Sequence, residues 1–244
     1  MQVIKFIIPL IFGILFISNS YALDCNRTIS AALSSQLDCE NSDSLTVNSG
    51  VVLNFNNNDA VNASNTDGVT IVNSGTIEHS VDEKQSVING SATRNLTITN
   101  NGIINSTKKY GVYIEDAEQV TITNNAGATI HTTYGGGTAS AELGAIYGDN
   151  IGNCASEDCY NSSDSNGGAG LTLYNYGTIS TRYRTIAGGL DDDDDKSRKI
   201  KIYNYDGGSI TAETSATIKF RDVEDFALYN YSGATIESGT EDAS

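Results

Sequence analysis

The 244-residue chain is poor in proline and lacks tryptophan. Its one proline, Pro9, lies close to the start of the chain. Proline has no backbone N–H to donate, so it is excluded from the middle of a β-sheet. A chain without proline beyond residue 9 is therefore free to consist almost wholly of central strands, and its 24 glycines supply the bends.

Basic residues are scarce as well: 14 Lys and Arg stand against 30 Asp and Glu, which gives a formal net charge of −16. Such a surface repels phosphate, so we exclude nucleic acid and anionic membranes as partners. Among ions, calcium suits such a chain best. The clearest acidic run, Asp191 to Asp195, lacks the alternating ligands of an EF-hand, so no cofactor is assigned.

Long apolar runs are absent except for one near the N-terminus. Residues 1–22 contain Lys5, an apolar run from Phe6 to Ile17, and small residues at Ser20 and Ala22. This pattern is typical of a secretory signal peptide, and the run is short for a membrane span. We therefore expect an exported protein whose mature chain begins at Leu23.

What the sequence does contain is a phrase that occurs six times. The copies are VTIVNSGTI from Val69, LTITNNGII from Leu96, VTITNNAGATI from Val120, LTLYNYGTI from Leu171, IKIYNYDGGSI from Ile200 and FALYNYSGATI from Phe226. They start 27, 24, 51, 29 and 26 residues apart, and the interval of 51, close to two repeats, indicates a coil with an insertion. A regular period of this length marks a stacked solenoid.

Each copy has apolar residues at its first and third positions, which is the alternation of a half-buried strand. Asparagine follows two positions after the second apolar residue. Stacked at one corner of successive coils, these side chains can hydrogen-bond to one another and to the backbone. The sequence thus predicts an asparagine ladder made of Asn73, Asn100, Asn124, Asn175, Asn204 and Asn230.

Further apolar alternations lie between the phrases, at GVYI from Gly111, GAIY from Gly144 and ATIKF from Ala216. About three short strands per coil predict an all-β fold, a right-handed parallel β-helix of about 6 to 8 coils. We place it at residues 45–240, with loop insertions at 133–170 and 187–198. Residues 241–244 are expected to be a tail or a truncation point.

The four cysteines form two local pairs, Cys25 with Cys39 and Cys154 with Cys159. In an exported chain such pairs indicate disulfides rather than metal ligands. The first pair lies in residues 23–44, where apolar residues between Thr28 and Leu37 have helical spacing. We interpret this segment as an N-terminal cap that covers the open end of the β-helix. The second pair would close a small loop within the first insertion.

Paired tyrosines distinguish the last three copies of the phrase. By register they fall into two columns. Tyrosine is favoured at interfaces because it combines an apolar ring with a polar hydroxyl, whereas simple cross-strand stacking is the alternative interpretation. We take them as a candidate contact strip for sugars or protein: Tyr174, Tyr176, Tyr203, Tyr205, Tyr229 and Tyr231.

No catalytic residue is assigned, because the sequence has no Ser-His-Asp signature, phosphate-binding loop or CxxC motif. One enzymatic alternative remains open, a carbohydrate-active β-helical lyase or hydrolase. It would rest on basic residues of neighbouring coils that line a groove beside Asp222: Arg182, Arg184, Lys219 and Arg221.

The signal peptide, the cap, the N-x-G-T-I type coils, the closely spaced cysteines and the acidic surface together give a family resemblance. Residues 23–240 resemble the passenger region of bacterial autotransporters. The resemblance implies export by a Gram-negative bacterium, passage across the outer membrane through a C-terminal β-barrel, and display or release at the cell surface. The 244 residues contain no series of barrel strands, so we expect them to be the front part of a longer protein.

The function expected from these features is that of a non-enzymatic passenger, adhesin-like or a stalk. Its partners would be a host or neighbouring cell surface, a glycan or matrix. The carbohydrate-active enzyme and a purely structural spacer are the alternatives.

Overall fold

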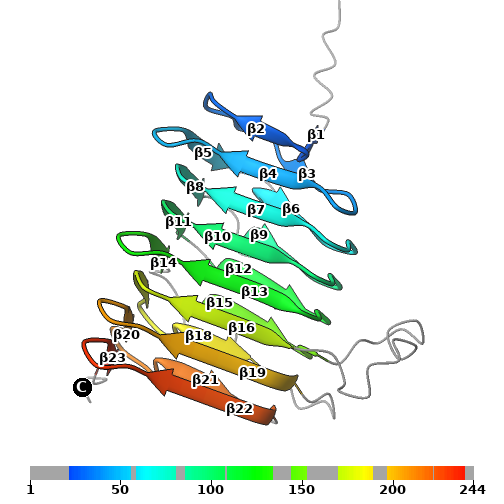
Figure 1. Ribbon diagram of the computed structural model, residues 1–244. Coiled ribbons are helices and arrows are strands. Elements are labelled where there is room, and N and C mark those ends of the chain that lie inside the picture. The colour runs from blue at the N-terminus through cyan, green and yellow to red at the C-terminus, as the bar shows by residue number, and fades with distance from the viewer. Residues whose placement is uncertain are drawn as a thin grey trace, which may run out of the picture.

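The computed structural model describes residues 22–55, 59–80, 86–107, 109–133, 144–152, 170–188, 197–221 and 223–239. All regular structure in these ranges is β, in three parallel sheets that we call A, B and C. Each turn of the chain contributes to the sheets in the order A, B, C, and Figure 1 shows the coils stacked from β1 to β22 and β23. The chain is therefore a parallel β-helix, as the repeat predicts. None of the described residues forms a helix with the length and hydropathy to cross a membrane.

Neighbouring strands within each sheet come from successive coils. Sheet A consists of β1 (Leu23–Asp24), β3 (Leu37–Asp38), β6 (Val61–Asn62), β9 (Ser86–Asn89), β12 (Tyr110–Glu115), β15 (Gly144–Asp149), β18 (Ile186–Gly188) and β21 (Ile218–Phe220). Sheet B consists of β2 (Arg27–Ile29), β4 (Ser44–Val47), β7 (Thr70–Asn73), β10 (Thr97–Asn100), β13 (Val120–Asn124), β16 (Leu171–Asn175), β19 (Ser197–Asn204) and β22 (Val223–Asn230). Sheet C consists of β5 (Val52–Phe55), β8 (Thr76–His79), β11 (Ile103–Ser106), β14 (Thr129–Thr132), β17 (Thr178–Thr181), β20 (Ser209–Ala212) and β23 (Thr235–Ser238).

Each copy of the repeated phrase forms one strand of sheet B and the next strand of sheet C. Equivalent residues pair across coils, so that Ile98 lies beside Ile71 on one side and Ile122 on the other. The interval of 51 residues is a single long coil, because β13 pairs directly with β16. Register is fixed by the apolar pattern, since a slip of one residue would turn every core side chain outward.

The core runs through the middle of the coils as columns of identical or similar side chains. In sheet B, Ile71, Ile98 and Ile122 are fully buried, and in sheet C Ile77 and Ile104 are fully buried as well. The alternate residues of the same strands face outward. Each coil thus buries its apolar residues against the coils on either side, which is why a single repeat would not fold alone.

The apolar spacing of the N-terminal segment is that of an α-helix, but the segment forms strands. Residues 23–44 contain β1, β2 and β3, which pair with strands of the following coil, so the β-helix starts earlier than residue 45. The disulfide between Cys25 and Cys39 is present, with the two Cα atoms 4.8 Å apart. That distance equals the spacing of adjacent strands, so the bond joins equivalent corners of the first two coils.

The first predicted insertion contains a strand of the β-helix. Within residues 133–170, Gly144–Asp149 form β15, which pairs with β12 and β18. The GAIY alternation therefore outweighs the polar composition around it, and residues 133–170 are not one continuous loop. Cys154, Cys159 and the acidic run Asp191 to Asp195 lie outside the described residues.

Candidate functional site

The six aligned asparagines stack at the corner where sheet B turns into sheet C. The Nδ2 of each of the first five donates to the Oδ1 of the asparagine in the next coil, over 2.8 to 2.9 Å. Each of the first five also donates to a backbone carbonyl of that next coil, as Asn124 does to Thr178 at 3.1 Å. These five side chains are fully buried, so the ladder holds coils together and offers no surface to a ligand.

The candidate tyrosines form two stacked columns, one on the outer face of sheet B and one directly after the ends of its strands. In one column the ring centroids of Tyr174, Tyr203 and Tyr229 are 5.2 and 4.8 Å apart. In the other, Tyr176, Tyr205 and Tyr231 are separated by 4.5 and 4.8 Å, with interplanar angles of 4° and 3°. We call these six residues the tyrosine strip.

The stacking decides which part of each tyrosine can meet a partner. Tyr203 lies between Tyr174 and Tyr229, so both of its ring faces are covered by neighbouring rings. The strip therefore presents a regular row of ring edges and hydroxyl groups to solvent. Within the stack of coils, Tyr174, Tyr176, Tyr203 and Tyr205 are partly exposed.

Threonines occupy the same face of sheet B in the preceding coils. Thr99 and Thr123 are in register with Tyr174, and Thr97, Thr121 and Thr172 form the neighbouring column. The outer face thus changes from hydroxyl side chains in β10 and β13 to tyrosines in β16, β19 and β22. The pairing of β13 with β16 continues these columns across an interval of 51 residues.

A second aromatic cluster lies on sheet A and was not predicted. Tyr110, Tyr113 and Tyr147 have ring centroids 4.9 to 5.7 Å apart, and Tyr110 and Tyr147 are almost fully buried. Burial raises the pKa of Tyr113 far above its ordinary value, and the hydrogen bond to Glu115 adds to this rise. Two of these tyrosines lie in the strings GVYI and GAIY, which the sequence analysis identified only as strands because of their alternation.

Three of the basic residues of the enzymatic alternative come together near β18 and β21. Burial and the charge of Arg221 lower the pKa of Arg184. The charge of Arg184, with burial and Arg221, lowers the pKa of Lys219. Arg182 instead lies over the ring of Tyr183 at 5.7 Å. In the part of the chain that the structure describes, no group of three His, Cys, Asp or Glu side chains is placed to hold a metal ion.

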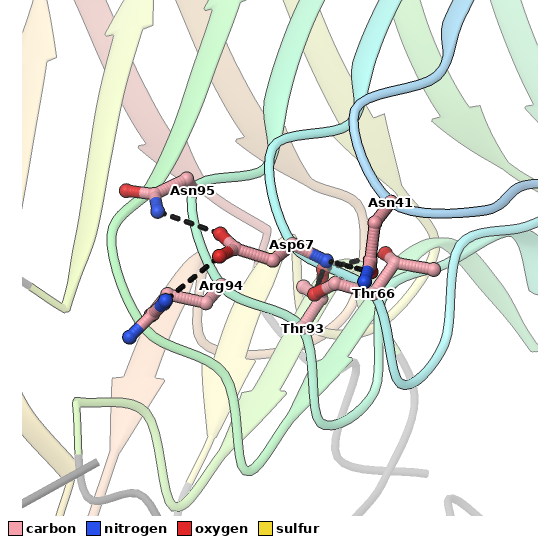
Figure 2. A network of polar contacts seen from close by, with 6 residues as sticks. All are labelled: Asn41, Thr66, Asp67, Thr93, Arg94 and Asn95. Atoms are coloured by element: carbon pink, nitrogen blue, oxygen red, sulfur yellow. Dashed lines mark hydrogen bonds and ion pairs between the residues drawn. The ribbon is translucent and has the colours of Figure 1, made fainter. Parts of the chain in front are cut away.

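A polar network joins the turns between sheets A and B in the N-terminal half (Figure 2). The Asp67 carboxylate accepts hydrogen bonds from Arg94 and Asn95, each at 2.7 Å, and the Asp67 backbone N–H donates to Asn41 at 2.8 Å. The Thr66 and Thr93 hydroxyls are 3.1 Å apart. The hydrogen bonds from Arg94 and Asn95 hold the pKa of Asp67 below its ordinary value.

Arg94→Ala is expected to raise the pKa of Asp67 towards that of an unfolded aspartate. A lowered folded pKa stabilises the fold above the ordinary pKa of the carboxyl, and this contribution disappears as the pH falls through the lowered value. The effect on stability should be small, because the two side chains are 43% and 41% exposed. NMR titration of the Asp67 carboxyl in the wild type and the variant measures the change. An unchanged pKa would show that Arg94 does not interact with Asp67 in solution.

Comparison with known proteins assigns the chain to no family. No family model, curated protein or solved structure matches it. Its function must therefore be inferred from its own residues and their arrangement.

Proposed function

We propose that this chain is a non-enzymatic, adhesin-like β-helical passenger, exported and displayed on or released from a bacterial surface, which contacts its partner through the tyrosine strip. The observation that carries the proposal is the pair of tyrosine columns along sheet B. Tyrosine buries a large ring and offers a hydroxyl while ordering few rotatable bonds, which favours it in recognition surfaces.

The β-helix supports this proposal by presenting the strip rigidly. Each tyrosine follows from the register of a sheet B strand, so neighbouring hydroxyl groups repeat at the strand spacing of about 4.8 Å. A binding surface that is already ordered loses little side-chain entropy when a partner docks. The signal-peptide pattern of residues 1–22 and the acidic composition are compatible with an exported rod of this kind.

Replacing all six tyrosines of the strip by serine is expected to weaken binding to cells, glycans or matrix at least about tenfold. The matched control changes the same six residues to phenylalanine, which keeps the stacked rings and removes only the hydroxyl groups. Circular dichroism confirms that both variants keep their β-structure, and binding of labelled protein to coated surfaces gives the affinity. Unchanged binding by the folded serine variant would refute the role of the strip. If the wild type binds nothing, the spacer alternative holds, and depolymerisation of a polysaccharide would favour the enzyme.

A further inference from the structure

A groove of about 290 Å³ opens on sheet B, beside the tyrosine strip. Its lining comes from three consecutive coils, and the strands β10, β13 and β16 contribute one threonine each: Thr97, Thr121 and Thr172. Because the three coils are stacked, the groove runs across the strands and along the axis of the rod. Asn95, Gln119 and Gly170 complete the side nearest to sheet A.

One side of the groove is formed by three residues at the same corner of successive coils. Asn95, Gln119 and Gly170 immediately precede the first apolar residue of three aligned phrases, so they occupy the same corner of successive coils. Asn95 and Gln119 have left-handed backbone angles, with φ of 55° and 53°. Gly170 has no Cβ, and one built there would overlap the carbonyl oxygen of Arg198. The close approach of the Arg198 backbone therefore requires glycine at this corner of the groove.

The rim of the groove is held in place by the network in Figure 2. The Asn95 amide donates to Asp67 at 2.7 Å, and Asp67 in turn accepts from Arg94 at 2.7 Å. This arrangement fixes Asn95 at the mouth of the groove. It also pairs the charges of Asp67 and Arg94 with each other. Among the described residues, the groove is lined by hydroxyl, amide and backbone groups and by Val120, and none of these lining residues has a charged side chain.

We propose that this groove binds a neutral polysaccharide chain laid along the axis of the rod. Hydroxyl and amide groups both donate and accept hydrogen bonds, which matches the sugar hydroxyls of such a chain. The net charge of −16 opposes acidic polysaccharides but leaves an uncharged ligand unaffected. A groove of this volume accommodates roughly one or two sugar rings at a time, with the rest of the chain continuing over the surface.

The tyrosine strip gives the polysaccharide a continuous path beyond the groove. β16 carries both Thr172, which lines the groove, and Tyr174, which begins one tyrosine column. The residue in register with Tyr174 in the preceding coil is Thr123, so one face of the first ring has no tyrosine stacked on it. The apolar C–H face of a sugar ring fits this position. The proposal thus rests on the proposed function of the strip and names the ligand class of that surface.

The experiment replaces the three groove threonines by valine, as T97V/T121V/T172V. Valine keeps the shape and the β-branched stem and replaces the hydroxyl group with a methyl group. The matched control is T76V/T129V/T178V, which makes the same change at outward positions of β8, β14 and β17 in sheet C. Affinity electrophoresis in gels containing dextran, mannan, galactomannan or β-glucan measures binding, and polygalacturonate serves as the acidic comparison.

The wild type and the sheet C control should be retarded by at least one neutral polysaccharide and not by polygalacturonate. The groove variant should bind at least about tenfold more weakly, as expected when several hydrogen bonds to the ligand are lost. Equal retardation of the groove variant, or no retardation of the wild type by any of the four neutral polysaccharides, would overturn the groove proposal. Tyrosine-dependent binding to cells would survive that result, so the two proposals can fail separately.

Discussion

Asn124→Ala is expected to lower the free energy of unfolding by about 2 to 4 kcal/mol. Asn124 lies in the middle of the ladder and is fully buried. Its Oδ1 accepts from Asn100 at 2.9 Å, and its Nδ2 donates to Asn175 at 2.9 Å and to the Thr178 carbonyl at 3.1 Å. Truncation removes these hydrogen bonds at once and leaves buried donors and acceptors on both neighbouring coils without their partner.

The last asparagine of the ladder supplies the matched control. Asn230 accepts from Asn204 at 2.8 Å but is exposed, so water can replace its hydrogen bonds. Asn230→Ala should therefore cost less than about 1 kcal/mol. Urea unfolding followed by circular dichroism measures both variants. Equal and small losses would show that the ladder contributes little to the cohesion of the coils.

Ile104→Ala is expected to cost about 2 to 5 kcal/mol, the range for removing a large aliphatic side chain from a packed core. Ile104 is fully buried and pairs with Ile77 and Ile130 of the adjacent coils. The cavity would open inside a column that continues through every coil from β5 to β20. Its neighbours cannot collapse into the space without breaking their own register.

The neighbouring residue Ile103 allows the same isoleucine-to-alanine substitution on the other face of the strand. Ile103 also lies in β11 but is 44% exposed. Ile103→Ala should therefore change the free energy of unfolding by less than about 1 kcal/mol. Thermal and urea unfolding of the two variants gives the comparison. Similar losses for both variants would contradict the alternation that defines the fold.

The repeated phrase was sufficient to predict the architecture and two of its columns. Alternation of apolar residues over four or five positions specifies a half-buried strand, and recurrence of the phrase, every 24 to 29 residues and once after 51, specifies its parallel neighbour. This alignment implies hydrogen bonds along the asparagine ladder, from Asn73 to Asn230, and stacked tyrosines. The structure contains both. The repeat alone brings equivalent positions together, because successive coils stack with these positions in register.

Local patterns were less informative where the repeat is irregular. The spacing of apolar residues between Thr28 and Leu37 suggested a helix, yet pairing with β4 and β6 makes this segment the first coil. Polar composition suggested one insertion over residues 133–170, yet pairing with β12 and β18 places Gly144–Asp149 in sheet A. In both cases hydrogen bonding to an existing sheet edge outweighs local preference.

The sequence by itself determined the coil, the buried columns and the asparagine ladder, because each depends on a period that the chain repeats. Only the tertiary structure showed the groove and the polar network on the outer surface. The groove is lined by Asn95, Gln119 and Gly170 together with threonines of three strands, and the Asp67 network holds Asn95 at its rim. The period aligns these residues in columns, but their side chains differ from coil to coil, so the period does not predict the groove or the hydrogen bonds at its rim.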